Sequence, residues 1–204
     1  MVKELIVASN NPNKIREIKQ ILSQYPMRIL SMGEIGVNID VDEDGTTFMQ
    51  NAYKKAKSVY DFLGRRFMVL ADDSGLMVKG LDGDPGVHSA RFAGEHGNDE
   101  KNNEKLLRLL KNKNTDSRMA KFLCAMVLIL ETDKMIEVQG EIKGVICKEE
   151  RGNNKFGYDP LFYVPEYGMT FGEMPAKLKN SISHRAKALE KLKIELGKYI
   201  EKKV

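Results

Sequence analysis

Short apolar runs and helical repeats of apolar residues follow one another along the first half of the chain. The runs at residues 4–8 and 27–32 are typical of short buried strands. In the segments after each run, apolar residues recur every three to four positions, which predicts two amphipathic helices. Their inward positions are Ile15, Ile18, Ile21 and Leu22 in the first helix, and Phe48, Ala52, Ala56, Val59 and Leu63 in the second.

The middle of the chain adds a strand and a long polar segment. Residues 66–75 (RFMVLADDSG) predict a strand that ends in two aspartates, with a turn beginning at Ser74-Gly75. Residues 80–99 are rich in glycine and polar residues and predict a long loop, which in a compact domain is often functional. A surface helix with a leucine face then begins after Asn98, whose side chain suits a helix cap.

The second half has longer strands. Residues 120–132 and 134–146 are apolar or alternating runs joined by a short turn, which predicts an antiparallel hairpin. A helix capped by Ser183 closes the chain through residue 203, with an inner face formed by Leu189, Leu192, Leu196 and Tyr199. We therefore expect an α/β fold with a mixed, twisted central sheet flanked by helices. It would be a single domain, residues 1–204, of two lobes with an active-site cleft between them.

Composition narrows the class of protein without identifying it. Of 204 residues, 42% are hydrophobic and 30% are charged, which is typical of a globular protein. The net charge of +4 is too mild to favour nucleic-acid or membrane binding. No apolar stretch reaches the ~20 residues of a membrane span, and the first apolar run is too short for a signal peptide. We expect a cytoplasmic protein in which Cys124 and Cys147 are free, buried thiols.

The first predicted strand runs into a polar turn, Ser-Asn-Asn-Pro-Asn-Lys. Asn11 can cap a helix whose first residue is Pro12, and this alone would explain the sequence. The same turn can also bind phosphate, because backbone N–H groups and the positive end of the helix dipole favour an anion there. Ser9, Asn10 and Lys14 would add donors. Both interpretations stay open at this point.

Carboxylates gather in two places. Residues 40–44 form an acidic run ended by Gly45, and the strand predicted at 66–75 delivers Asp72 and Asp73. Adjacent strand residues point to opposite faces, so the two aspartates could share one ligand only if the strand ends there. Oxygen clusters of this kind suit Mg²⁺, which takes few protein carboxylates and keeps waters and substrate phosphates. The alternative is that Asp73 caps a turn and that the acidic loop is merely solvated.

Basic and aromatic groups complete the candidate chemistry. Each lysine or arginine alone is most simply a surface residue, but together with the acidic loops they would make a metal–phosphate site. In the segment FGYD, Phe156 could stack on a planar base while Asp159 accepts hydrogen bonds from its edge. The phenylalanine could equally anchor the loop in the core. His184 and Arg185 form a compact pair of donors near the start of the last helix.

Motifs of other enzyme classes are missing from the sequence. It has no Walker loop, no dinucleotide-binding glycine motif, no cysteine–histidine metal pattern and no nucleophile elbow. The chemistry that remains is a metal-dependent reaction of phosphates without a P-loop.

Six motifs in order make the chain resemble the inosine/xanthosine triphosphate pyrophosphatase family over nearly its whole length. The first two comprise Ser9, Asn11, Lys14 and Glu17, and then Glu43, Gly45, Thr47, Phe48, Asn51 and Ala52. The other four are ADDSGL (71–76), PGVHSARFAG (85–94), FGYDPLF (156–162) and SHRAKAL (183–189). FGYDP with SHR is the most specific pair. Many relatives carry Thr-Gly-Asn in the first turn, where Asn10 could supply the left-handed conformation of glycine.

The resemblance implies an Mg²⁺-dependent enzyme that hydrolyses ITP, dITP and XTP to the monophosphate and pyrophosphate, usually as a homodimer. It makes Asp73 the catalytic base and a metal ligand, with Glu43 and Asp72 as further acids near the metal. The residues implied to bind the triphosphate are Ser9, Asn10, Asn11, Pro12, Asn13, Lys14, Lys55 and Ser74. Those implied to bind the purine base are Phe156, Gly157, Tyr158, Asp159, Lys179, His184 and Arg185.

The implied chemistry also accounts for selectivity among purines. Hypoxanthine and xanthine carry an acceptor oxygen at position 6, where adenine has an amino donor. Buried donors from Lys179, His184 and Arg185 would therefore reject ATP. Two rival functions remain. A septum-associated nucleotide pyrophosphatase would share the fold but act on other nucleotides, and FGYDP with SHR argues against it. A non-catalytic nucleotide sensor would not depend on Asp73, so the variant Asp73→Asn separates it from an enzyme.

Overall fold

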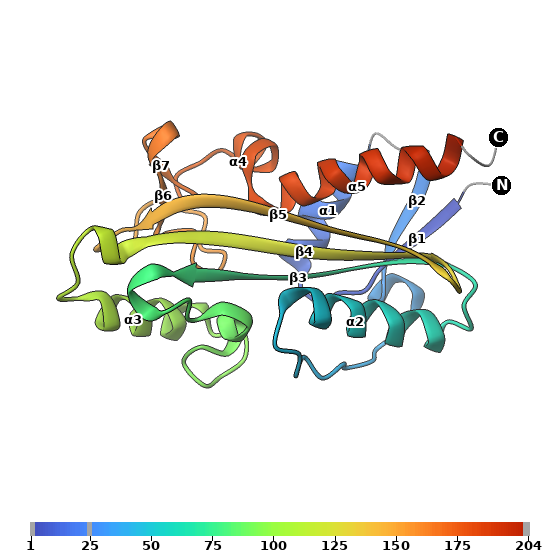
Figure 1. Cartoon of the computed structure of the whole chain (residues 1–204), viewed down its shortest axis with the longest axis horizontal. Coiled ribbons are helices and arrows are strands. Elements are labelled where there is room, and N and C mark those ends of the chain that lie inside the picture. Colours follow the sequence, from blue (N-terminus) through green and yellow to red (C-terminus); the bar gives the residue numbers. More distant parts are fainter. Residues whose placement is uncertain (1–2, 24–25, 202–204) are drawn as a thin grey trace. The chain divides into compact units, whose positions relative to one another are not determined.

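The computed structural model describes residues 3–23 and 26–201, and the chain divides into two compact units (Figure 1). Unit 1 consists of Met1–Asp73, Cys124–Gly140 and Arg185–Val204, and unit 2 consists of Ser74–Leu123 and Glu141–His184. The chain leaves unit 1 directly after Asp73 and last returns to it at Arg185. Predicted site residues therefore stand at both of these boundaries.

Within the described residues, the strands form one seven-stranded sheet in the order β2-β1-β3-β4-β5-β6-β7. They are β1 (Lys3–Val7), β2 (Met27–Ser31), β3 (Met68–Val78), β4 (Met119–Glu131), β5 (Lys134–Ile146), β6 (Phe162–Val164) and β7 (Met169–Thr170). Strand β1 pairs in parallel with β2 and β3, whereas β6 pairs antiparallel with β5 and β7. The predicted α/β fold with a mixed sheet is confirmed.

Helices occur where the apolar repeats predict them. They are α1 (Pro12–Leu22), α2 (Phe48–Phe62), α3 (Asp99–Leu110), α4 (Ala176–Ile182) and α5 (His184–Glu201). Short 3-10 turns lie at η1 (Gly33–Ile35), η2 (Lys79–Leu81), η3 (Gly86–Arg91), η4 (Asp116–Arg118) and η5 (Pro165–Tyr167). The predicted caps Asn11 and Asn98 are confirmed, because each accepts a hydrogen bond from an N–H group of the first turn, whereas capping of the last helix by Ser183 stays a prediction. Over the described part of the chain, no helix is long and apolar enough to cross a membrane.

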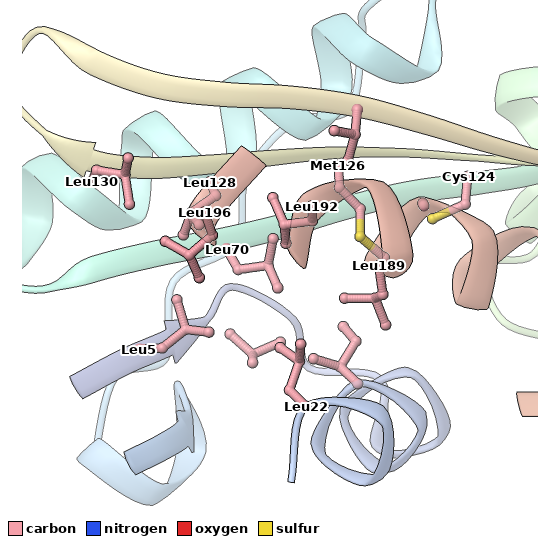
Figure 2. Packing of buried hydrophobic residues seen from close by; sticks show 14 residues of the cluster. Leu5, Leu22, Leu70, Cys124, Met126, Leu128, Leu130, Leu189, Leu192 and Leu196 are labelled. Atoms are coloured by element: carbon pink, nitrogen blue, oxygen red, sulfur yellow. The ribbon is translucent and has the colours of Figure 1, made fainter. Parts of the chain in front are cut away.

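Two hydrophobic clusters form the core of unit 1, one on each face of its strands. Helices α1 and α5 cover one face, where α5 contributes Leu189, Leu192 and Leu196 (Figures 1 and 2). Helix α2 covers the other face through Ala52, Ala56 and Val59. Successive residues of β3 alternate between the clusters, since Leu70 belongs to the first and Ala71 to the second. This alternation sets the direction of the two aspartates that follow.

Unit 2 has a core of its own, rich in aromatic rings. Helix α3 contributes Leu106 and Leu110, and the rings of Phe122, Phe162 and Phe171 lie 4.6 to 6.0 Å apart between centroids. Tyr158 and Leu161 belong to the same cluster, so the segment FGYDPLF is tied to this core.

The structure differs from the predicted elements at β3, at α4 and at the short strands β6 and β7, which the pattern did not predict. The predicted turn at Ser74-Gly75 is wrong: β3 continues to Val78, because Leu76 and Val78 are buried apolar residues that hold the strand in the core. Residues 176–182 form α4, which the pattern did not predict because a two-turn helix offers too few repeats. The last predicted helical residues, 202 and 203, lie outside the described residues. Both cysteines are free, although Cys147 is only half-buried.

Candidate active site

Strand β3 carries Asp72 and Asp73 through the interior of unit 1. Their side chains are 1% and 5% exposed. Because the strand continues past them, the two carboxylates point to opposite faces: Asp72 bonds to α5, and Asp73 bonds to α2. The expectation that the strand ends here is therefore wrong, and each acid has its own hydrogen-bond partner, whereas the charge of Lys14 acts on both.

Asp72 belongs to a buried group of charges. The guanidinium of Arg185, on α5, donates from Nη2 to Asp72 Oδ2 at 3.1 Å and from Nη1 to Glu17 of α1. Lys14 Nζ lies 3.4 Å from the same Asp72 oxygen. Burial lowers the pKa of Arg185, but the charges of Asp72 and Glu17 raise it by more, so the guanidinium stays protonated. The group joins β3, α1 and α5.

A side chain of α2 forms a hydrogen bond to Asp73. Asn51, which is fully buried, donates from Nδ2 to Asp73 Oδ2 at 3.0 Å, and its Oδ1 accepts from the N–H of Gly45 at 2.8 Å. Burial raises the pKa of Asp73, and the charges of Lys14 and Lys55 offset that effect in part. A buried carboxylate whose negative charge is incompletely compensated suits a proton acceptor or a cation ligand.

The acidic loop before α2 supplies Glu43. Its Oε1 lies 2.8 Å from Lys55 Nζ, and the same ammonium donates to the backbone oxygen of Asp72 at 3.3 Å. Burial raises the pKa of Glu43, but Lys55 and Lys14 together lower it by more, so its pKa lies below the usual value. Burial lowers the pKa of Lys55, and the surrounding acids raise it by more. Glu43 and Lys55 are therefore both charged at neutral pH.

Polar groups of the turn before α1 form hydrogen bonds within that turn and with the start of the helix. Ser9 Oγ accepts from the N–H of Asn11 at 3.2 Å, and Asn11 in turn caps the helix. Asn10 does not take the left-handed conformation considered for it. Among the described residues other than glycine, positive φ angles occur at Arg65 and Asp82. The capping interpretation is confirmed, and phosphate binding by this turn stays a prediction.

In unit 2, Asp159 and Lys179 form a buried ion pair beside Phe156. Both side chains are 4% exposed, and Asn154 Nδ2 donates to the same Asp159 oxygen at 2.9 Å. Lys179 Nζ lies 5.0 Å from the centroid of the Phe156 ring, within the range of a cation–π contact. The ring, the acid and the ammonium predicted to bind a base therefore lie together.

His184 and Tyr158 are buried in the same unit. The imidazole of His184 stacks on Phe122, with centroids 4.7 Å apart and an interplanar angle of 11°. The Tyr158 hydroxyl donates to the backbone oxygen of Ser89 at 2.8 Å, and burial raises the pKa of Tyr158. It is therefore Tyr158 that anchors the FGYD segment in the core, while Phe156 is half-buried.

The predicted site residues divide between the two units. Those expected at the phosphates and the metal lie in unit 1, except for Ser74, which opens unit 2. Those expected at the base lie in unit 2, except for Arg185, whose guanidinium bonds to Asp72 and Glu17 in unit 1. Among the described residues, no three His, Cys, Asp or Glu side chains gather closely enough to hold a metal ion by themselves.

No individual role was predicted from the sequence for Asn51 or Glu17, although each bonds to a buried site residue in the structure. Both are buried polar residues on the inner faces of amphipathic helices, where Asn51 follows Phe48 by one helical turn and Glu17 precedes Ile18. A polar group on such a face requires a buried partner. That misfit with the apolar repeat is the signal that could have identified them.

Known proteins match the chain along nearly its full length. A model of the Ham1 family matches residues 5–195. A dITP/XTP pyrophosphatase of Clostridium tetani (strain Massachusetts / E88) is 53% identical over 99% of this chain and 100% of its own. One of Clostridium perfringens (strain 13 / Type A) is 52% identical over 96% and 98%. The structure of a HAM1 protein from Coxiella burnetii has a TM-score of 0.86 at 36% identity, covering 97% of this chain and 100% of that one. The resemblance seen in the motifs is confirmed.

Replacing Arg185 tests its place in the buried charge group. Arg185→Met removes the cation that Asp72 and Glu17 share, and breaking such a buried pair costs about 3–5 kcal/mol. The control Arg28→Met removes an exposed pair with Glu4, at 3.1 Å, and should cost about 0–1 kcal/mol. Urea unfolding measures both losses. Equal losses in the two variants would contradict the role given to Arg185.

Proposed function

Because this chain belongs to the Ham1 family, we propose that it hydrolyses the deaminated purine triphosphates ITP, dITP and XTP to the monophosphate and pyrophosphate. Relatives named dITP/XTP pyrophosphatase support this substrate class. The observation that carries the proposal is the buried carboxylate of Asp73, whose raised pKa suits a proton acceptor, in the same unit as Lys14 and Lys55.

In this proposal the triphosphate binds to groups of unit 1. Lys14 and Lys55 neutralise its charge and stabilise the negative charge that moves onto the leaving pyrophosphate. The start of α1 supplies the positive end of a helix dipole. The residues proposed to contact the phosphates there, together with the hydroxyl that opens unit 2, are Ser9, Asn10, Asn11, Pro12, Asn13 and Ser74.

The carboxylates of unit 1 fit Mg²⁺. This ion takes one or two protein carboxylates and completes its shell with water and substrate phosphates, so a preformed set of three ligands is not required. Asp73 and Glu43 would hold it, because the raised pKa of Asp73 reflects a buried charge that a cation would stabilise. Bound Mg²⁺ would supply charge neutralisation and a water of lowered pKa. Asp72 is not included, because it faces Arg185 across the other side of β3.

Asp73 would take a proton from the attacking water. Attack at the α-phosphorus, in line with the bridging oxygen, breaks the α–β bond, places the oxygen of water in the monophosphate and releases pyrophosphate. Asn51 keeps the carboxylate in one orientation through its bond to Oδ2. Asp72 and Arg185 would act indirectly, by fixing β3 and α1.

The base would bind to groups of unit 2. Phe156 would stack on the purine, with Gly157 and Tyr158 shaping the turn that carries it. Lys179 would donate to the 6-oxygen, with Asp159 fixing the ammonium and His184 adding a further donor. Adenine presents an amino group at that position, so donor would face donor, which is costly when both are buried.

We further propose that the protein works in the cytoplasm as a homodimer. The support for the homodimer is the family resemblance of the motifs, including FGYDP and SHR, and the support for the cytoplasm is that both cysteines are free thiols.

Product analysis tests the proposed reaction. Incubation with Mg²⁺ and ITP should give IMP and pyrophosphate in equal amounts, and turnover of ATP should be at least about 100-fold slower. Chelation of the metal should stop the reaction and added Mg²⁺ should restore it. Release of inorganic phosphate from ITP would contradict the bond assignment, and absence of turnover would favour a sensor.

Two separate lysine substitutions on α4 test base selectivity. Lys179→Met removes the proposed donor to the 6-oxygen, and the preference for ITP over ATP, measured as the ratio of kcat/KM values, should fall by at least about tenfold. The control Lys177→Met alters an exposed lysine of the same helix and should leave the ratio unchanged. An unchanged ratio in Lys179→Met would remove this lysine from base recognition.

A further inference from the structure

Helix α3 holds Gly157 of the FGYD turn through both backbone polar groups of that residue. Asp99, in the first turn of the helix, accepts from the N–H of Gly157 at 2.8 Å. Asn103, one turn later, donates from Nδ2 to the carbonyl oxygen of Gly157 at 3.1 Å. All three residues belong to unit 2. The two side chains therefore fix the backbone at the residue that directly follows Phe156.

Gly157 lies in a tight turn and has a backbone conformation that glycine adopts most easily. The N–H of Asp159 donates to the carbonyl oxygen of Phe156 at 3.1 Å, which makes Gly157 the second residue of the turn. Its φ is +57°, in the left-handed region. Added freedom at Gly157 would change the placement of Phe156 relative to Asp159, because they are the two ends of this turn.

Asn103 is arranged as a donor. Its side chain is buried, and Nδ2 also donates to Glu150 Oε1 at 3.0 Å. Over the residues that the structure describes, Oδ1 of Asn103 is buried without a hydrogen-bond partner. A buried amide that uses its nitrogen twice and its oxygen not at all is oriented by the two acceptors it serves. An aspartate in its place would set an oxygen against the oxygens of Gly157 and Glu150.

We infer that Asp99 and Asn103 are positioning residues for nucleobase binding, acting through Gly157. They hold the turn so that the ring of Phe156 and the Asp159–Lys179 pair are already in place when the base arrives. Preorganisation of this kind lowers the entropy lost on binding, and so it strengthens binding without changing the reacting groups. The inference rests on the proposed function insofar as the ligand is a purine triphosphate.

The neighbouring residue supplies a matched control. Asn102 is also a buried asparagine of α3, but it bonds to a different loop: its Oδ1 accepts from the N–H of Ala93 at 2.7 Å, and its Nδ2 donates to the backbone oxygen of Ala90 at 3.3 Å. Asn102→Ala thus removes comparable hydrogen bonds from the same helix without touching Gly157.

Steady-state kinetics with ITP and Mg²⁺ test the inference. Asp99→Ala should raise KM about tenfold, the factor expected from one lost hydrogen bond, and Asn103→Asp, which loses two, should raise it at least as much; kcat should stay within about twofold in both. Asp99→Asn, which keeps an acceptor oxygen, should restore KM. Asn102→Ala should keep the wild-type KM. An equal rise in Asn102→Ala would overturn the inference, since the effect would then be general loosening of α3.

A second measurement is independent of turnover. The chain contains no tryptophan, so Phe156→Trp introduces a single fluorescent reporter at the turn. In the nucleotide-free protein, adding Asn103→Asp to Phe156→Trp should increase acrylamide quenching of the indole, and adding Asn102→Ala should not. Unchanged quenching with Asn103→Asp in a folded protein would overturn the inference. Absence of ITP turnover in the wild type would refute the proposed function and leave this measurement to decide the positioning role.

Discussion

The guanidinium of Arg185 lies inside unit 1 between the carboxylates of Asp72 and Glu17, and the local arrangement depends on this contact. A charge buried to this degree persists only if it is paired, because its hydration has been lost. The pairing joins β3, α1 and α5, and it fixes which face of β3 Asp72 occupies. Since side chains alternate along a strand, Asp73 must then face α2.

The two adjacent aspartates therefore have different electrostatic surroundings. Asp72 bonds to a guanidinium, whereas Asp73 bonds to the neutral amide of Asn51 and has a raised pKa because burial outweighs the nearby lysines. The first arrangement stabilises a fold, and the second leaves a carboxylate able to take a proton or a cation. The base-binding candidates are organised separately, by the Asp159–Lys179 pair and the turn held by α3.

Local features of the fold were predictable from the sequence, and distant pairings were not. Caps and helix faces depend on residues three or four positions apart, so Asn11, Asn98 and the apolar repeats identified them. The partners of Arg185 lie 113 and 168 residues away in sequence, and no local pattern encodes such a contact. The course of β3 was mistaken for the same reason, because Asp-Asp-Ser-Gly favours a turn locally and burial of Leu76 and Val78 overrides it.

The different roles of the two aspartates are tested most directly by comparing Asp72→Asn with Asp73→Asn, with urea unfolding measured in metal-free protein at pH 8 and ITP turnover measured with Mg²⁺ present. A raised pKa means that ionised Asp73 costs stability above that pKa, so Asp73→Asn should unfold at the same or higher urea concentration than the wild type while losing ITP turnover. Asp72→Asn should lose stability, because Arg185 then keeps one acidic partner where it had two. Destabilisation by Asp73→Asn with unchanged turnover, or a neutral Asp72→Asn, would contradict the account.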